Sequence, residues 1–511
     1  MKILNFILFA LIFGNLSTFA NEQGWFVGGQ EKTKKAPKTS INSAESLNHM
    51  PGPPAAPMRQ SERKKPPQPD YLIGKVIWGE SVTFNTGKDK YKELSDWNLA
   101  IKDVETFTQQ LSDFGLSYHY AHVNLSTFAY DPQLMPALYF SGVRTIKLTD
   151  SQIRQLREYV LKGGMIICDS LYGSPYFYEQ CKQLFAKAFP EETWRTIPLD
   201  HPIFSTYYDI EEVYFPTDPD RNKPFMEAIY IGSRVGVLCS RYGLGKGLED
   251  DLAVFETLEE RGLQPLYYEP EAAKALAANI GGYIVGYAEA GRIEGLPELF
   301  GLPDQRRPTD ELVFAQIKHN GAWNVHPGAA PSLLNQLQTE AAVKVNLKRV
   351  PIDLEKDSLT DFPFLYLTGL DTIAFSDRER DVLKSFLLEG GRVFANNGLG
   401  LSTFHQSLVD ELKRMFPNGA LRDLPPEHDI YHILSSVTSV QYTESTRTSN
   451  PDIADKPHLQ GFYVNGELAL IYSPYDMEAG WLDARFPLMQ GLENHSARTL
   501  GKNVITYILS H

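Results

Sequence analysis

The chain has 511 residues, with 49 Lys and Arg against 63 Asp and Glu, and a formal net charge of −14. This acidic balance argues against a nucleic-acid-binding protein, which needs a dense cationic surface. The three cysteines are an odd number, so a complete disulfide framework is excluded.

The amino-terminal 20 residues have the pattern of a secretory signal. They contain Lys2, an apolar run over 3–16 and Ala20, after which we expect cleavage. The alternative is a retained membrane anchor, but the apolar run is shorter than the ~20 residues that span a bilayer. No cysteine follows the cut, so no lipid anchor is expected. The sequence therefore predicts export to the periplasm or the extracellular space.

Residues 21–69 are rich in proline and carry eight Lys and Arg with almost no periodic apolar residues. This composition predicts an extended, disordered tether. Any contact with a membrane would be made through this tether. A solvated spacer is the simpler interpretation, and contact with an anionic surface or peptidoglycan is the alternative.

The rest of the chain repeats itself. Residues 137–201 align without a gap on 364–428, at a constant offset of 227 residues. The aligned segments share a Gly-Gly pair and end on His201 and His428. Two copies of one domain are therefore joined in tandem. We expect copy 1 over 70–290, a connector over 291–309 and copy 2 over 310–511.

Hydrophobic periodicity gives both copies the same order of elements. In copy 1 it predicts strands at 72–78, 116–123, 137–141 and 165–168, and helices at 97–114 and 149–161, the second capped by Thr149. In copy 2 it predicts strands at 311–316, 343–350, 364–368 and 392–395, and helices at 330–341 and 376–388. The alternation predicts an α/β fold with parallel βαβ units covered on both faces.

The connector is expected to pack against the domains. It holds Leu296, Leu299, Phe300 and Leu302 among prolines and glycines, which is too apolar for a free linker.

Several motifs together carry a resemblance to a known family. They are the Phe-Leu-Tyr-Leu-Thr-Gly run at 364–369, the Gly-Gly pairs, Asp169, the Asp-His-Pro at 200–202 and the segment 473–481. Both copies resemble the bacterial family called domain of unknown function 4159. They are also similar to trehalose-utilisation-protein-like domains of the class I glutamine amidotransferase-like fold. The resemblance implies two flavodoxin-like, three-layer domains with mostly parallel sheets, which bind ligands at the carboxyl ends of their strands.

In glutamine amidotransferases a nucleophilic cysteine follows the strand that the Gly-Gly pair introduces. The resemblance places Asp169 and Asn396 at that turn, and neither can act as a thiolate. Cys168 lies inside the preceding apolar run and is Ala395 in copy 2, so it is interpreted as a core residue. The same holds for Cys181 and Cys239, although one disulfide between cysteines remains open.

The first candidate constellation is Asp169, Asp200 and His201 in copy 1. An Asp beside a His could orient the imidazole or share a metal, so these three are the catalytic candidates. The structural alternative is that His201 caps a loop while Asp169 binds backbone N–H groups. Copy 2 carries Asn396, Glu427 and His428 instead.

The second constellation belongs to copy 2. Asp476 and Trp481, with Tyr475 beside them, could cradle a sugar or a cation, and Asn396 and His428 complete the candidate ligand site. Copy 1 has Gly243 and Leu248 in place of Asp476 and Trp481. The alternative is that Trp481 packs against the carboxy-terminal helix.

Motifs for nucleotides and metals fail on spacing. The glycines at 243–247 and 398–400 match neither a P-loop nor a dinucleotide fingerprint. Metal-ligand pairs such as His-Glu-x-x-His are missing, so no cofactor, metal or nucleotide is expected.

The sequence thus favours an exported, non-catalytic binding or scaffolding protein with a glycan or protein partner. The alternative is a carbohydrate-acting hydrolase that uses Asp169 and His201. Membership of a periplasmic complex is a third class.

Overall fold

Copy 1 builds one seven-stranded sheet in the order β4-β1-β5-β6-β9-β8-β7. The strands are β4 (Tyr118–Asn124), β1 (Tyr71–Ile77), β5 (Ala137–Gly142), β6 (Met165–Ser170), β9 (Arg234–Ser240), β8 (Met226–Ile231) and β7 (Arg195–Thr196). The first five run parallel, and β8 and β7 continue the sheet antiparallel. Numbered along the chain, the parallel strands follow the order 2-1-3-4-5 of flavodoxin-like folds.

Copy 2 repeats this sheet strand for strand, in the order β11-β10-β12-β13-β16-β15-β14. Its strands are β11 (Val345–Asp353), β10 (Leu312–Lys318), β12 (Phe364–Gly369), β13 (Arg392–Asn397), β16 (Glu467–Ser473), β15 (Gln460–Val464) and β14 (Arg422–Asp423). The predicted tandem of α/β domains is confirmed. This computed structural model describes residues 71–85, 91–249, 265–304, 311–341, 343–362 and 364–511, so the predicted signal and tether lie outside the described residues.

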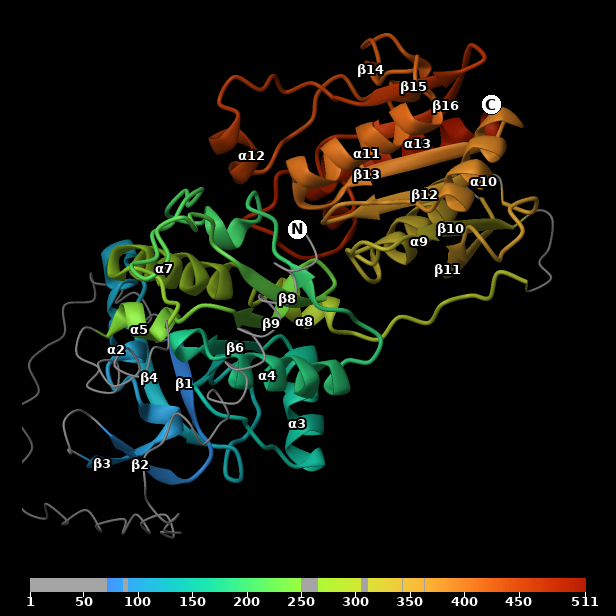
Figure 1. The fold of residues 1–511 in the computed structure, drawn as a ribbon. Coiled ribbons are helices and arrows are strands. Elements are labelled where there is room, and N and C mark those ends of the chain that lie inside the picture. The colour runs from blue at the N-terminus through green and yellow to red at the C-terminus, as the bar shows by residue number, and fades with distance from the viewer. Residues whose placement is uncertain (1–70, 86–90, 250–264, 305–310, 342, 363) are drawn as a thin grey trace, which may run out of the picture.

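Helices cover both faces of each sheet (Figure 1). In copy 1, α3 (Asp150–Leu161) and α4 (Pro175–Ala188) pack on one face, and α2 (Asp103–Gln109) and α7 (Pro270–Gly286) on the other. In copy 2 the corresponding pairs are α10 (Asp377–Leu388) with α11 (Ser402–Met415), and α9 (Ala329–Ala341) with α13 (Asn494–Ser510). The cores on the α2–α7 face and the α9–α13 face form one continuous cluster, which joins the copies.

Shorter elements complete each copy. Copy 1 adds the hairpin β2 (Ser81–Asn85) and β3 (Tyr91–Ser95), with α5 (Leu244–Leu248) and α8 (Ala290–Glu294), and copy 2 adds α12 (Glu444–Ser449). No helix in the described part of the chain has both the length and the apolar character needed to cross a membrane.

Local sequence explains the best-predicted helices. Thr149 caps α3 and Ser376 caps α10, each in a reciprocal bond with the residue three positions later, Gln152 or Glu379. The predicted cap at Thr149 is confirmed. The three cysteines are buried and unbridged, as expected of core residues.

The predicted helix over 97–114 is wrong in its extent. The segment instead forms a 3-10 turn at Asp96–Asn98, then α2, then a second 3-10 turn at Ser112–Phe114. The carbonyl of Ala100 accepts a hydrogen bond from the Lys75 ammonium, so it does not serve a helical N–H group. Gly115 then ends the segment with a φ of +72°.

The connector does not pack through its leucines, so that prediction is wrong. Leu296, Leu299 and Leu302 are exposed, Leu299 by 77%. Phe300 does contact copy 2, since the Arg349 guanidinium lies 5.3 Å from its ring centroid and Trp323 lies 6.1 Å away. Polar groups hold the connector instead, because Glu298 forms an ion pair with the buried Arg349.

We expect Leu299→Ser to change the free energy of unfolding by no more than about 0.5 kcal/mol, because the side chain is exposed. Glu298→Ala should cost about 3–5 kcal/mol, since it leaves Arg349 buried without its ion pair. Denaturant unfolding measures both variants. Equal stability of the two would show that the connector is held by neither group.

Candidate functional site

Asp169 binds backbone rather than facing an open site. It is the penultimate residue of β6 and is fully buried. Its carboxylate accepts hydrogen bonds from the N–H groups of Leu244 (2.8 Å) and Gly245 (2.7 Å) and from the Tyr139 hydroxyl (2.9 Å). Burial raises the pKa of Asp169 to about 6, and these three donors oppose that rise. The sequence expectation of a turn at Asp169 is corrected to a strand position whose side chain holds the start of α5.

Asn396 likewise binds a backbone N–H group in copy 2. Its side-chain oxygen accepts a hydrogen bond from the Met477 N–H group at 2.9 Å, the counterpart of the Leu244 bond. Its amide nitrogen donates to Asp476 at 3.1 Å. A fully buried amide with both ends bound internally is not available to an external ligand.

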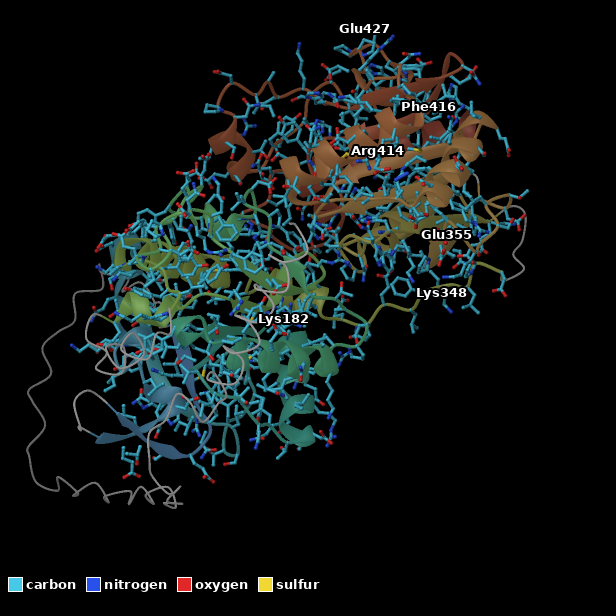
Figure 2. The ribbon with its side chains drawn as sticks, in the orientation of Figure 1. Lys182, Lys348, Glu355, Arg414, Phe416 and Glu427 are labelled. Carbon is cyan, nitrogen blue, oxygen red and sulfur yellow. The ribbon has the colours of Figure 1, made fainter. Side chains whose placement is uncertain are left out.

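Asp200 is turned away from Asp169 and toward copy 2. Its carboxylate accepts hydrogen bonds from the Thr403 N–H group (2.7 Å) and from the hydroxyls of Ser402 (2.7 Å) and Thr403 (2.9 Å). An acidic side chain at the first turn of α11 stabilises that helix end. Its counterpart Glu427 is exposed at the outer edge of copy 2 (Figure 2).

His201 is a buried cap. Its Nδ1 accepts a hydrogen bond from the Ile203 N–H group at 3.2 Å, and its ring lies between Tyr230 and Tyr283. Burial lowers the pKa of His201 to about 3, so the ring is neutral. His428 makes the matching bond to Ile430 at 3.2 Å. Asp169 and His201 each bind backbone groups of their own surroundings, so the first constellation is not assembled.

The sharp turn of the amidotransferase-like pattern lies three residues after Asp169. Tyr172 has a φ of 61° and Leu399 a φ of 57°, at equivalent places between a strand and the following helix. Non-glycine residues rarely take this left-handed conformation. It is the geometry of a nucleophile elbow. Here the elbow carries a buried phenol and a leucine, so neither copy presents a thiol or an alcohol at that position.

The second constellation is also internal. Trp481 is fully buried, its indole N–H donates to the Ala497 carbonyl at 3.2 Å, and its ring lies among Phe314, Tyr366 and Phe394. The packing interpretation against α13 is therefore the right one. Tyr475 is half-buried and lies 5.1 Å from the ring of Tyr442.

Asp476 takes part in a buried ion triad between the copies. His326 Nδ1 lies 2.8 Å from Glu294 and its Nε2 lies 2.9 Å from Asp476. Glu294 ends α8 in copy 1, whereas Asp476 follows β16 in copy 2. Glu294 also accepts hydrogen bonds from the N–H group (3.1 Å) and the hydroxyl (2.7 Å) of Ser233.

The two carboxylates set the charge of the imidazole. Burial alone would lower the pKa of His326, but Asp476 and Glu294 raise it to about 10. In return His326 holds the pKa of Asp476 below its usual value, against the effect of burial. Nearby Glu478, which accepts a hydrogen bond from the Tyr366 hydroxyl, has a pKa that burial raises to about 7. His326 is thus a buried cation.

Glu298, a carboxylate of the connector, also binds residues of copy 2. Glu298 binds the Arg349 guanidinium twice, at 3.0 and 2.5 Å, and accepts a bond from the Gly328 N–H group at 3.2 Å. Arg349 also donates to Gln316 and Asn324. Groups of copy 1 and its connector therefore bind the polar residues of copy 2 near the carboxyl ends of its strands.

In copy 1 the corresponding edge holds a buried pair of its own. The Lys75 ammonium lies 2.6 Å from Asp103, and both side chains are almost inaccessible. Burial raises the pKa of Asp103, and Lys75 opposes that rise. Within the described ranges, no three His, Cys, Asp or Glu side chains are grouped to hold a metal ion.

Sequence reasoning missed His326, Glu294, Glu298 and Arg349. The sequence did contain a signal. Copy 2 has Asp476 where copy 1 has Gly243. When Trp97-Asn98 is aligned with Trp323-Asn324, copy 2 also has His326 where copy 1 has Ala100. A carboxylate and an imidazole that appear together in one copy suggest that they are partners.

Comparison with known families agrees with the repeat. The profile described as Domain of unknown function (DUF4159) matches residues 86–288 and again 313–509. No curated protein matches the chain.

Solved structures resemble the chain only distantly. A putative GMP synthase protein from Thermoplasma acidophilum is 14% identical, covering 39% of this chain and 95% of its own, with a TM-score of 0.19. The flavodiiron protein from Giardia intestinalis is 10% identical, covering 55% of this chain and 71% of its own, with a TM-score of 0.13. The fold assignment therefore rests on the strand order.

We expect Asp169→Asn to fold but to lose about 1–3 kcal/mol, because the new amide would turn one N–H donor toward the N–H of Leu244 or Gly245. The reciprocal change Asn396→Asp should also destabilise, since it sets a carboxylate against Asp476. Chemical denaturation tests both. Unaltered stability of Asp169→Asn would contradict the capping role.

The triad makes stability depend on pH. His326 has a folded-state pKa of about 10 against 6.5 as its ordinary value, so its contribution is complete below pH 6.5 and is lost as the pH rises toward 10. We expect the melting temperature to fall over this range in the wild type and to fall less in His326→Gln and Glu294→Gln. His495→Gln, which changes an exposed histidine of α13, is the control and should keep the wild-type slope. Parallel slopes in all four proteins would rule out a charged His326.

Proposed function

The chain belongs to the DUF4159 family, in two tandem copies, and we propose that it is an exported, non-catalytic binding or scaffolding protein. One observation carries the proposal. The charged groups near the strand ends of copy 2, where this fold binds ligands, are bound to carboxylates of copy 1 and its connector. A domain whose site is closed by its neighbour acts as a structural partner.

The elbow residues support the absence of catalysis. A nucleophile at this turn must be exposed and activated by a base. Tyr172 is buried, and burial raises the pKa of its hydroxyl, which keeps it protonated. Leu399 has no reactive group. Cys168 is fully buried, and burial raises the pKa of its thiol well above the usual range.

The hydrolase alternative lacks support in the geometry. It needs Asp169 and His201 to act on one substrate, yet each is fully buried and each binds backbone N–H groups. A glycan or a protein therefore remains the proposed partner, bound on a surface other than the strand ends of copy 2. Export rests on the signal-like pattern of residues 1–20.

The test is a turnover screen of the mature protein against glycans and small metabolites, beside the variants Tyr172→Phe and His201→Gln. We expect no product above the level of the variants. Pull-down with and without residues 21–69 then asks whether a protein partner is recruited through the tether. Any substrate consumed by the wild type but not by Tyr172→Phe would overturn the proposal.

A further inference from the structure

Two cavities border corresponding Gly-Gly loops of the two copies, although the rest of their linings differ. In copy 1 a cavity of about 290 Å³ lies beside the loop that leads into β5 and the Gly-Gly pair that leads into β6. In copy 2 a cavity of about 860 Å³ lies beside the loop before β12 and the Gly-Gly pair before β13. Gly163 lines the first and its counterpart Gly390 lines the second.

The two cavities differ in charge. The copy 1 cavity is lined by Lys162 and Arg292 and by no acidic residue among those the structure describes. Neither cation forms an ion pair with another described residue. At the place of Lys162, copy 2 has Glu389, and Glu355, Asp357 and Asp381 line the same cavity with one lysine, Lys356. The same Gly-Gly loop thus borders a cationic cavity in copy 1 and an acidic cavity in copy 2.

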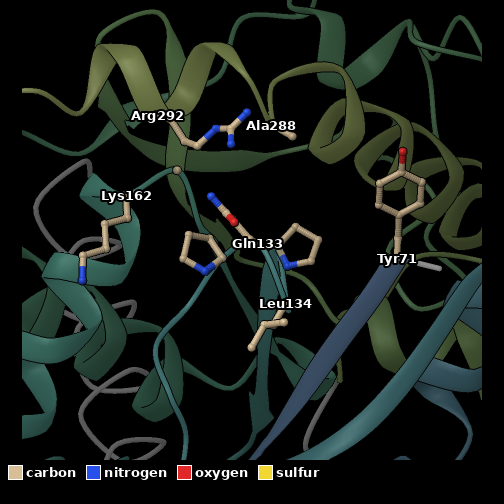
Figure 3. A pocket seen from close by; sticks show the side chains of 9 residues that line it. Tyr71, Gln133, Leu134, Lys162, Ala288 and Arg292 are labelled. Carbon is tan, nitrogen blue, oxygen red and sulfur yellow. The ribbon is translucent and has the colours of Figure 1, made fainter. Parts of the chain in front are cut away.

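The position of Arg292 is built into the backbone. Gly163 has a φ of +104°, and a Cβ atom there would lie 3.0 Å from Cγ of Arg292. Only glycine allows α8 to approach this loop so closely. Figure 3 shows the Gln133 amide directed toward the Arg292 guanidinium, with Tyr71 on one side and Lys162 on the other, its ammonium directed away from Arg292. A guanidinium favours a planar anion such as a carboxylate, because its two parallel N–H groups can bind both oxygens.

Aromatic rings lead away from the cavity along α7. Tyr71 lines the cavity and lies 5.3 Å from Tyr118, whose hydroxyl donates to the Gly281 carbonyl. Tyr118 is itself buried, and a second group of rings lies at α7, where Phe114 stacks on Tyr207 at 3.9 Å and meets Tyr208 edge-on at 5.7 Å. Tyr207 and Tyr208 are 37% and 45% exposed.

Copy 2 keeps the hydrogen bonds that hold the backbone of Tyr207 and Tyr208 but lacks the aromatic rings. Asn279 accepts hydrogen bonds from the N–H groups of Tyr207 and Tyr208, and Asn503 accepts the matching bond from Ser435. The residues that replace the two tyrosines are Leu434 and Ser435. Copy 1 alone therefore combines exposed rings with a cationic cavity.

We propose that this surface of copy 1 binds an acidic oligosaccharide. A sugar carboxylate pairs with Arg292 in the cavity, where Lys162 adds positive charge at the rim, and the following pyranose rings stack on Tyr71 and on the Tyr207–Tyr208 pair. Aromatic faces accept the C–H groups of sugar rings, while the cations select the acid. The cavity volume is near the lower end for ligand sites, which suits one sugar unit. This deepens the proposed function by naming the ligand class and rests on it.

The experiment is calorimetric titration of the mature protein with trigalacturonic acid, with maltotriose and inorganic phosphate as comparison probes. The wild type should bind trigalacturonic acid, and neither maltotriose nor phosphate should match that affinity. Lys162→Glu, which installs the residue of copy 2, and Arg292→Gln should each weaken binding about tenfold or more, as expected for a lost charge-assisted bond. Tyr207→Leu with Tyr208→Ser should weaken it several-fold.

Glu389→Gln in the copy 2 cavity is the matched control and should bind like the wild type. If maltotriose bound as tightly as trigalacturonic acid, the carboxylate would not be recognised. If phosphate bound as tightly, the site would be specific for an anion and not for a sugar. Absence of binding, or binding unaffected by Lys162→Glu and Arg292→Gln, overturns the inference and leaves the scaffolding role intact. Cleavage of the bound sugar would instead overturn the non-catalytic role and leave the binding site intact.

Discussion

The contact between His326 and two carboxylates from different copies is the constraint on which the arrangement of this protein depends. An imidazole that is enclosed without a carboxylate bound to it is neutral, as His201 is. His326 is held positive because Glu294 and Asp476 each lie within 3 Å of a ring nitrogen. Removal of His326 would leave two buried carboxylates without their cation, which is the costly case for a buried ion pair. The three residues therefore fix how the carboxyl edge of copy 2 meets α8.

Comparison of the two copies shows which parts of the fold are interchangeable. Asp169 and Asn396 differ in charge yet bind the same backbone position, because each offers an oxygen acceptor to the N–H group of Leu244 or Met477. In copy 1, Tyr139 donates to Asp169, whereas in copy 2 the equivalent Tyr366 donates to Glu478. Gly245 occupies the place of Glu478, and a Cβ atom there would lie 2.8 Å from Asp169. The tyrosine thus keeps its position in both copies, whereas its acceptor lies at the end of β6 in copy 1 and after β16 in copy 2.

The sequence was sufficient for the fold because both periodicity and repetition report on local structure. Strand positions and the capping boxes at Thr149 and Ser376 depend on neighbours in the chain, so a local pattern can predict them. The site could not be predicted in the same way. Asp200 and His201 are adjacent in sequence, yet one binds α11 of the other copy and the other is enclosed by tyrosines. The direction of Asp200 depends on the packing of the two copies, and that of His201 on contacts with distant residues of copy 1, which no local pattern encodes. The prediction that the connector leucines pack is wrong for a related reason, since Glu298 holds the connector through its ion pair with Arg349.

Buried ion pairs are weak sources of net stability, because the desolvation of each charge offsets much of the attraction. Hydrophobic contacts between the copies, such as the Tyr287–Phe486 ring contact, are less selective about geometry than a hydrogen-bonded triad. The triad and the Glu298–Arg349 pair restrict how the two copies can be oriented, since each requires its acceptors within hydrogen-bond distance. The apolar cluster thus brings the copies together, and the charged groups select one orientation. A fixed orientation keeps the opposite edge of copy 1, with its cationic cavity and exposed tyrosines, facing outward as a constant surface.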